Sequence, residues 1–341
     1  MLTVPSINRT PEATTSTPRF LALDITKGIL VLLMVIYHSV NYSTQFYLSF
    51  RYMAFLPPTF IIITGFLLGR VYAPRAIVSG NANWRLLERG GKLLLVFIAL
   101  NLGAQSIRSA NYHGQSLGLR HFFVHWPDTF IAGGSRAAAF EVLLPIAYLL
   151  LIAPLLLKIN RFHRLLIVIL FMIAAFVAVI LEREGAASAN LNFMAAGLLG
   201  MALSVVTWQS LQKPVKYLPP AIAAYGLYTV LANSWGQTFL LQITGATLAL
   251  AIVLGISHYL TVTRIGRLLA LVGAYSLLAY IIQIAILQVL SHQYGRPPPL
   301  SFGLLLYASL TLALTTGTVA ATHLLRRKVR LADIAYRAVF P

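Results

Sequence analysis

The chain has 341 residues, of which 58% are hydrophobic and only 10% are charged, and its formal net charge is +18. Soluble domains carry about 25% charged residues, and even a large soluble domain leaves much of its surface in contact with water. This composition therefore excludes a soluble enzyme, a coiled coil and a disordered chain, and it predicts a protein that lies in lipid.

Three segments are predicted in chain order. Residues 1–20 are rich in Thr, Pro and Ser and predict a disordered cytoplasmic tail, residues 21–325 predict a single transmembrane domain, and residues 326–341 predict a basic cytoplasmic tail. A spanning helix needs about 20 mostly apolar residues. The apolar runs therefore predict an all-α polytopic membrane protein with about ten transmembrane helices, near residues 22–42, 54–72, 92–107, 137–157, 165–181, 191–208, 218–235, 238–260, 268–290 and 300–325.

The Lys and Arg residues predict the orientation of these helices. With the N-terminus inside, 19 of the 26 fall on inner segments and six on outer segments, and positively charged loops stay in the cytoplasm. Both termini are therefore expected to be cytoplasmic. Because the basic residues are spread between apolar runs, anionic lipid accounts for the charge and no nucleic-acid partner is expected. The chain has no Cys, which excludes disulfides, thiolate metal sites and a cysteine nucleophile.

The first predicted span carries a stripe of polar residues. Lys27 and His38 are eleven residues apart, about three helical turns, and so return to nearly the same face, about 16 Å from each other along the axis. Asp24 and Asn41 each lie three residues from one of them, on neighbouring positions. Ionisable groups within spans are costly and therefore mark candidate functional sites. This layout suits an anionic ligand bound by Lys27 near the inner surface and proton transfer by His38 deeper in the membrane. Alternatively, Asp24 and Lys27 only cap the helix entry and snorkel, and His38 is a buried histidine bonded to a neighbouring helix.

Several motifs occur in the order typical of one family. The segment LDITKGILVLLMVIYH (23–38) resembles the opening motif of the acyltransferase-3 family of integral membrane acyltransferases, in which an Asp, an Arg-Gly pair and a His follow one another. PPTFIIITGFLLGRVY (57–72), the basic WRLLERGGKLL (84–94) and IGRLLALVGAYSLLAYIIQ (265–283) resemble later segments of the family. FEVLLPIAYLLLIAPLLL and LNFMAAGLLGMAL are most similar to the branch that succinylates periplasmic glucans.

The resemblance implies that acyl-coenzyme A is the donor substrate and approaches from the cytoplasm. Lys27, with Arg85 and Arg89 nearby on the inner side, is then expected to attract the phosphates of acyl-coenzyme A, and Asp24 to hold Lys27 in place. The family has Arg where this chain has Lys27, which keeps the positive charge but loses the planar fork of a guanidinium. No metal is expected.

The resemblance further implies a glycan acceptor of the cell envelope. A histidine that titrates near neutrality suits removal of the proton from a sugar hydroxyl, so His38 is expected to act as the base. Three side chains are expected to orient His38 or the acceptor: Tyr37, Asn41 and Tyr42. Glu141 is expected either to contact the acceptor or to pair with Arg136. The late-span His of the family is Gln283 here, and an amide cannot relay protons.

Two other functions stay open beside acetyl or succinyl transfer to a glycan hydroxyl. The departures at Lys27 and Gln283 suit a non-catalytic relative that serves as a subunit of a membrane assembly. Proline-interrupted spans suit a transporter or flippase. The protein is expected to be a multi-pass protein of the inner membrane of a bacterium, in contact with membrane lipids. A homo-oligomer or a larger membrane complex is also open.

Overall fold

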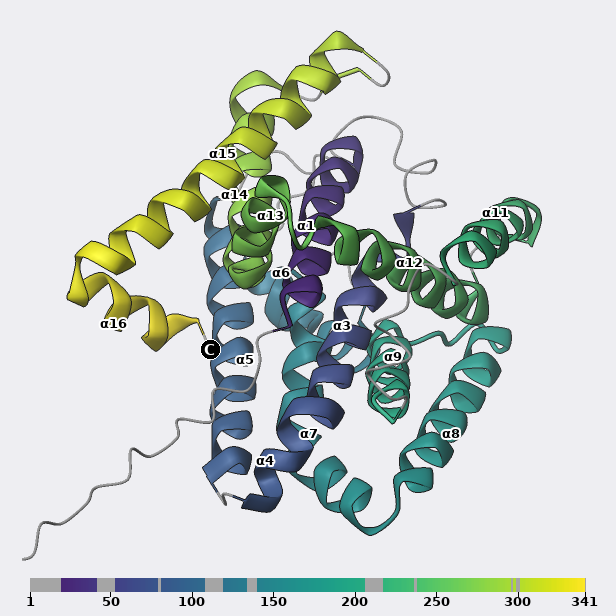
Figure 1. The fold of residues 1–341 in the computed structure, drawn as a ribbon. Helices are drawn as coiled ribbons and strands as arrows, with labels where there is room; N and C mark the ends of the chain where they lie inside the picture. Colours follow the sequence, from purple (N-terminus) through teal and green to yellow (C-terminus); the bar gives the residue numbers. More distant parts are fainter. Residues whose placement is uncertain are drawn as a thin grey trace, which may run out of the picture.

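The computed structural model describes residues 20–41, 53–78, 81–107, 119–133, 140–205, 217–235, 238–295, 297–298 and 301–340. Within these ranges every regular element is a helix (Figure 1). The tail predicted over residues 1–20 lies outside them except for Phe20. The elements are α1 (Leu21–Asn41), α3 (Leu56–Leu67), η1 (Leu68–Tyr72), α4 (Ala73–Val78), α5 (Asn81–Ile107), α6 (Leu119–Val124), η2 (Asp128–Ala132), α7 (Leu143–Phe162), α8 (Arg164–Arg183), α9 (Ala189–Leu203), α11 (Leu218–Trp235), α12 (Phe239–Leu260), α13 (Arg264–Ala274), α14 (Ser276–Tyr294), α15 (Phe302–Lys328) and α16 (Arg330–Val339).

The helices have the length and composition of membrane spans. Among the described residues, seven helices are long and apolar enough to cross a bilayer: Leu21–Asn41, Leu56–Ala76, Leu143–Phe162, Arg164–Arg183, Phe239–Leu260, Ser276–Tyr294 and Phe302–Lys328. The predicted class, an all-α polytopic membrane protein, is therefore confirmed. Helices α5, α9 and α11 lie at the three other predicted positions, and α9, with 15 residues, is shorter than a typical span.

One predicted span is divided in the structure. The run 268–290 forms two helices, because Tyr275 leaves the helical conformation with φ −109° and ψ 25°. The first of them, α13, lies directly against α1. A Cβ atom built on Gly273 would be 1.8 Å from the carbonyl oxygen of Asp24, and one built on Gly28 would be 2.0 Å from that of Leu269. Two backbones in contact thus fix α13 beside the polar start of α1.

Small residues also join α3 to α9. A Cβ atom built on Gly65 would lie 1.9 Å from the carbonyl oxygen of Gly197, and one built on Gly200 would lie 2.0 Å from that of Ile62. Close backbone approach through small residues is a common way for helices to associate in lipid. The largest buried apolar cluster surrounds this contact and also includes residues of α1, α5, α7 and α12.

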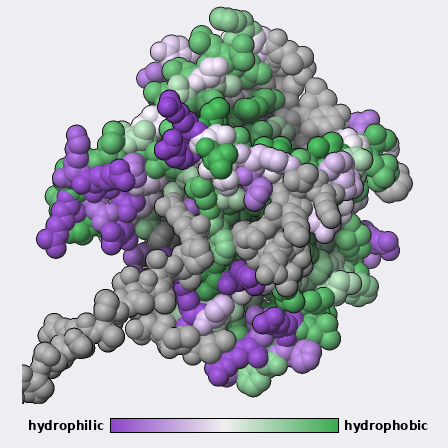
Figure 2. Space-filling view, viewed as in Figure 1, coloured by the Kyte–Doolittle hydropathy of each residue, from purple (hydrophilic) through white to green (hydrophobic). Residues whose placement is uncertain are grey.

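The segment predicted as a basic tail, 326–341, begins inside α15 and continues as the amphipathic helix α16. Arg326 fixes α16 by donating to Asp333 at 2.6 and 2.9 Å, and its guanidinium lies 3.9 Å from the ring centre of Tyr336. The hydrogen bond from Arg326 holds the pKa of Asp333 below its usual value. Figure 2 shows hydrophilic side chains over α16 and over the lower end of the molecule, with apolar side chains over much of its upper part.

Candidate functional site

A cavity of about 590 Å³ lies beside the N-terminal end of α1, the end expected to face the cytoplasm. We call it the Lys27 cavity. Its walls come from the start of α1, the segment 67–75, Arg89 of α5 and Ala274 at the end of α13. The contact between α1 and α13 therefore forms one side of it. Among its lining residues are four basic side chains and a single acidic one: Lys27, Arg70, Arg75, Arg89 and Asp24.

Asp24 and Lys27 form an ion pair at the edge of this cavity. Lys27 Nζ lies 2.8 Å from Asp24 Oδ1, and the side chains are 20% and 13% exposed. Residues three apart on a helix are neighbours, so α1 itself places this pair. Asp24 neutralises one positive charge, and the three arginines leave the cavity with a net positive charge, which suits a ligand with several phosphate groups.

A π-helix and the short helix that follows it carry two of the basic residues to the cavity. Pro74 has no backbone N–H, so the carbonyl of Arg70 loses its usual helical donor. The backbone widens before Pro74 into η1, where the Ala73 N–H donates to the carbonyl of Leu68, five residues earlier. Arg70 and Arg75 lie on this stretch and both line the Lys27 cavity. From the sequence, both are predicted only on an inner segment, with no ligand role, although Arg70 lies within the motif 57–72.

The two arginines expected to bind the donor on the inner side, Arg85 and Arg89, both lie on α5 but differ in position. Arg89 lines the cavity and donates a hydrogen bond to the hydroxyl of Tyr72, over whose ring its guanidinium lies at 5.7 Å. Arg85 is exposed and does not line the cavity. It is one turn closer to the start of α5, beyond the rim. The structure thus joins Asp24, Lys27 and Arg89, adds Arg70 and Arg75, and leaves Arg85 outside.

The other predicted site residues gather near the opposite end of α1. The ring centre of His38 lies 5.1 Å from that of Tyr37 and 6.3 Å from that of Tyr280. The side chains of Tyr37 and Asn41 are joined by a hydrogen bond, and Glu141 is close enough to act electrostatically on both tyrosines. We call these residues the outer polar cluster: Tyr37, His38, Asn41, Glu141 and Tyr280. Tyr42 and Arg136 lie outside the described residues.

Two buried groups at this level have unsatisfied polar atoms. His38 Nε2 is shielded from solvent and has no hydrogen-bond partner among the described residues. Gln283, one turn beyond Tyr280 on α14, is completely buried, and both polar atoms of its amide are likewise without partners in the described part of the chain. Buried polar groups are nearly always hydrogen-bonded, so such atoms mark a place where a polar ligand or water would be stabilised. The predicted alternative, a His38 bonded to a neighbouring helix, is not found among the described residues.

An apolar layer separates the two ends of the polar stripe. Leu30, Val31 and Met34 occupy the turns of α1 between Lys27 and His38, and each is at most 2% exposed. They belong to the packed core clusters of the bundle. His38 does not line the Lys27 cavity. The stripe is therefore continuous on the helix face but is interrupted by packed side chains in space.

Comparison with protein-family models, with curated proteins and with solved structures finds no match to this chain. The resemblance to the acyltransferase-3 family therefore rests on its short ordered motifs. The chemistry of the site is argued from the two polar regions and the layer between them.

Proposed function

We propose that the protein is an integral membrane acyltransferase that moves an acetyl or succinyl group from cytoplasmic acyl-coenzyme A to a hydroxyl of a cell-envelope glycan. The observation that carries the proposal is the Lys27 cavity, where four basic side chains from three parts of the chain converge on the expected donor side. In this proposal both termini are cytoplasmic, the chain crosses the inner membrane of a bacterium about ten times, and the glycan reaches the opposite end of α1.

The donor binds through its phosphates in this proposal. Arginine forks make paired hydrogen bonds to phosphate oxygens, and the lysine adds a point charge. Asp24 keeps the Lys27 ammonium at the rim. Because Arg70 and Arg75 belong to η1 and α4 while Arg89 belongs to α5, a bound polyphosphate would hold these two parts of the chain together. The acyl end of the donor then points along α1 toward the outer polar cluster.

The reaction takes place at His38. The imidazole removes the proton of the acceptor hydroxyl while the hydroxyl oxygen attacks the thioester carbonyl, which forms the new ester bond. The carbon–sulfur bond breaks, and the leaving thiolate takes up the proton from His38 to give free coenzyme A. Tyr37 and Asn41 orient the imidazole or the acceptor, and Glu141 contacts the acceptor. The apolar layer of Leu30, Val31 and Met34 must open for the thioester arm to reach His38, so the proposal requires a second conformation.

The test measures acyl transfer by the purified protein in lipid nanodiscs, with acetyl- or succinyl-coenzyme A and a periplasmic glucan. The released thiol can be detected directly, because the chain contains no Cys. Lys27→Ala is expected to raise the KM for acyl-coenzyme A about tenfold or more, since a charge-assisted contact to phosphate is lost. Its matched control is Lys328→Ala, an exposed lysine at the inner end of α15.

His38→Ala is expected to lower kcat by about a hundredfold or more and to leave binding of acyl-coenzyme A unchanged. Its matched control is His292→Ala, an exposed histidine at the end of α14. Transfer that survives His38→Ala would exclude His38 as the base. A wild-type protein that neither binds nor consumes acyl-coenzyme A would overturn the proposal.

The apolar layer favours one second candidate, a transporter of a phosphorylated or carboxylated compound. Polar sites on both sides of a closed layer are what alternating access requires. Flux of such a compound into proteoliposomes, without release of free coenzyme A, would distinguish the transporter from the acyltransferase.

A further inference from the structure

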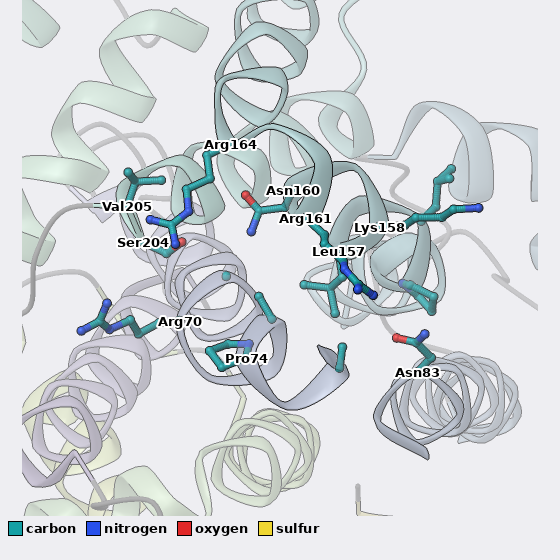
Figure 3. A pocket seen from close by; sticks show the side chains of 15 residues that line it. Arg70, Pro74, Asn83, Leu157, Lys158, Asn160, Arg161, Arg164, Ser204 and Val205 are labelled. Carbon is teal, nitrogen blue, oxygen red and sulfur yellow. The ribbon is translucent and has the colours of Figure 1, made fainter. Parts of the chain in front are cut away.

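A second cavity, of about 820 Å³, lies where α7 turns into α8 (Figure 3). We call it the corner cavity. It is bounded by η1 and α4, by the ends of α7 and α9, and by the first residue of α8. Arg70 and Pro74 line both this cavity and the Lys27 cavity. The widened helix before Pro74 thus forms a wall common to the two.

The turn between the helices concentrates positive charge. A single residue, His163, connects α7 to α8, and its Nδ1 accepts a hydrogen bond from the Leu165 N–H at 3.3 Å. Lys158 and Arg161 precede this sharp turn on α7, Arg164 follows it on α8, and all three line the corner cavity. In Figure 3 the side chains of Arg161 and Arg164 extend from the turn toward the side on which Pro74 lies, whereas the Lys158 ammonium points to the outer edge.

These charges are not balanced by acidic groups. None of the residues that line the corner cavity is Asp or Glu. Arg70, Lys158, Arg161 and Arg164 form no ion pair within the described part of the chain. Arg164 also occupies the first position of α8, where the helix dipole is positive and a cation is unfavourable. An anion bound at this corner would relieve both the mutual repulsion of the basic groups and the unfavourable position of Arg164.

The corner also adjoins an apolar surface. Leu155 lines the cavity and is 60% exposed, and Phe162 at the end of α7 is 75% exposed. Beyond the turn, α8 is apolar from Leu165 to Leu181, and only 11% of its most hydrophobic stretch is buried within the protein. A ligand that combines an anionic head with apolar chains would contact the basic residues and this surface at once, whereas a soluble phosphate compound would contact only the basic residues.

We infer that the corner cavity binds the phosphate headgroup of an anionic phospholipid of the cytoplasmic leaflet, whose acyl chains lie along the exposed face of α8. Basic pockets between transmembrane helices on the cytoplasmic side suit such headgroups. Asn83 Oδ1, which lines the cavity without a hydrogen-bond partner among the described residues, would accept a hydrogen bond from a headgroup hydroxyl such as that of phosphatidylglycerol. This inference does not depend on acyl transfer.

Native mass spectrometry of the detergent-purified chain tests it, with phosphatidylglycerol and phosphatidylcholine offered in equal amounts. The wild type is expected to retain phosphatidylglycerol. The double variant Arg161→Gln/Arg164→Gln is expected to bind it about tenfold or more weakly, because two charge-assisted hydrogen bonds to phosphate are lost. The matched control is Arg183→Gln, which removes an exposed arginine at the opposite end of α8. Both corner residues are exposed and without ion-pair partners among the described residues, so the variant is expected to fold.

A parallel arm separates the two possible sources of the phosphate. Inorganic phosphate in large excess is expected to leave the phosphatidylglycerol complex of the wild type in place, because it cannot replace the acyl-chain contacts. Displacement of the lipid by inorganic phosphate would overturn the lipid assignment in favour of a soluble phosphate compound. Equal retention of phosphatidylglycerol by the wild type and the double variant would overturn the site itself.

Discussion

The contact between α1 and α13 makes a sharp prediction about Gly273. In the variant Gly273→Ala, the new methyl group would start 1.8 Å from the carbonyl oxygen of Asp24, whereas ordinary contact begins at 3.4 Å. The atoms in conflict belong to two helix backbones, so no side-chain rotation relieves the clash. Overpacking of this kind costs up to about 3 kcal/mol, and the better helix propensity of Ala returns about 1 kcal/mol. We expect a net loss of stability of about 2 kcal/mol.

The matched control is Gly317→Ala on α15. A Cβ atom built on Gly317 meets nothing within 4 Å, so this variant keeps only the gain in helix propensity, about 1 kcal/mol. Reversible unfolding in mixed micelles, followed by circular dichroism, measures both variants. Gly273→Ala should also weaken binding of acyl-coenzyme A, because α13 and the start of α1 both line the Lys27 cavity. If the two variants unfold alike, the backbone contact and the cavity wall it forms are refuted.

Three further predictions concern hydrogen bonds between segments. Both carboxylate oxygens of Glu182 lie 3.1 Å from the first backbone nitrogen of α12, so this side chain caps the start of that helix. Glu182→Gln should lower the stability by about 1 kcal/mol in the same unfolding assay, and an unchanged unfolding midpoint would contradict this capping role. The side-chain amide of Asn190 donates to the carbonyls of residues 129–131 at 3.1 to 3.3 Å. Asn190→Leu should therefore speed hydrogen exchange across η2, and equal exchange in the variant and the wild type would show that these bonds do not stabilise η2. The hydrogen bond from Arg326 lowers the pKa of Asp333 in the folded protein. The stability that the ionised Asp333 gives to α16 is therefore complete above its pKa in the unfolded chain, about 3.9, and is lost as the pH falls through its lowered pKa in the folded protein. The protection factors of the α16 amides, which correct for the intrinsic pH dependence of exchange, should therefore fall in acid for the wild type, whereas Asp333→Asn should show the low protection at every pH.

The local features of the site could be predicted from the sequence. The spacing of Asp24 and Lys27 places them on one helix face, and the structure has their ion pair at 2.8 Å. Gly65 and Gly69 form a GxxxG pair, a pattern typical of close helix contacts in lipid, and Gly65 meets Gly197 of α9. Both inferences follow from the helical repeat alone, which fixes neighbours within a helix whatever surrounds it.

The partners of these residues could not be predicted in the same way. Arg70 and Arg75 join Lys27 because Pro74 widens the helix, and Arg85, which the sequence favoured, lies outside the cavity. The buried side chains of Leu30, Val31 and Met34 separate Lys27 from His38, although the two residues share a face of α1. The first outcome depends on a local widening of one helix, and the other two depend on how one helix is rotated against another.

The sequence by itself determined the class of this protein, because a chain with so few charges can satisfy its backbone in lipid only as helices or a closed barrel, and its long apolar runs have the length of helices. It also determined the polar stripe of α1 and the close contact at Gly65. Only the tertiary structure decided that α13 breaks from α14, that two basic cavities share one wall, and that an apolar layer separates Lys27 from His38. In lipid, the residues that face a neighbouring helix are as apolar as those that face the membrane, so hydropathy carries little information about which helices meet.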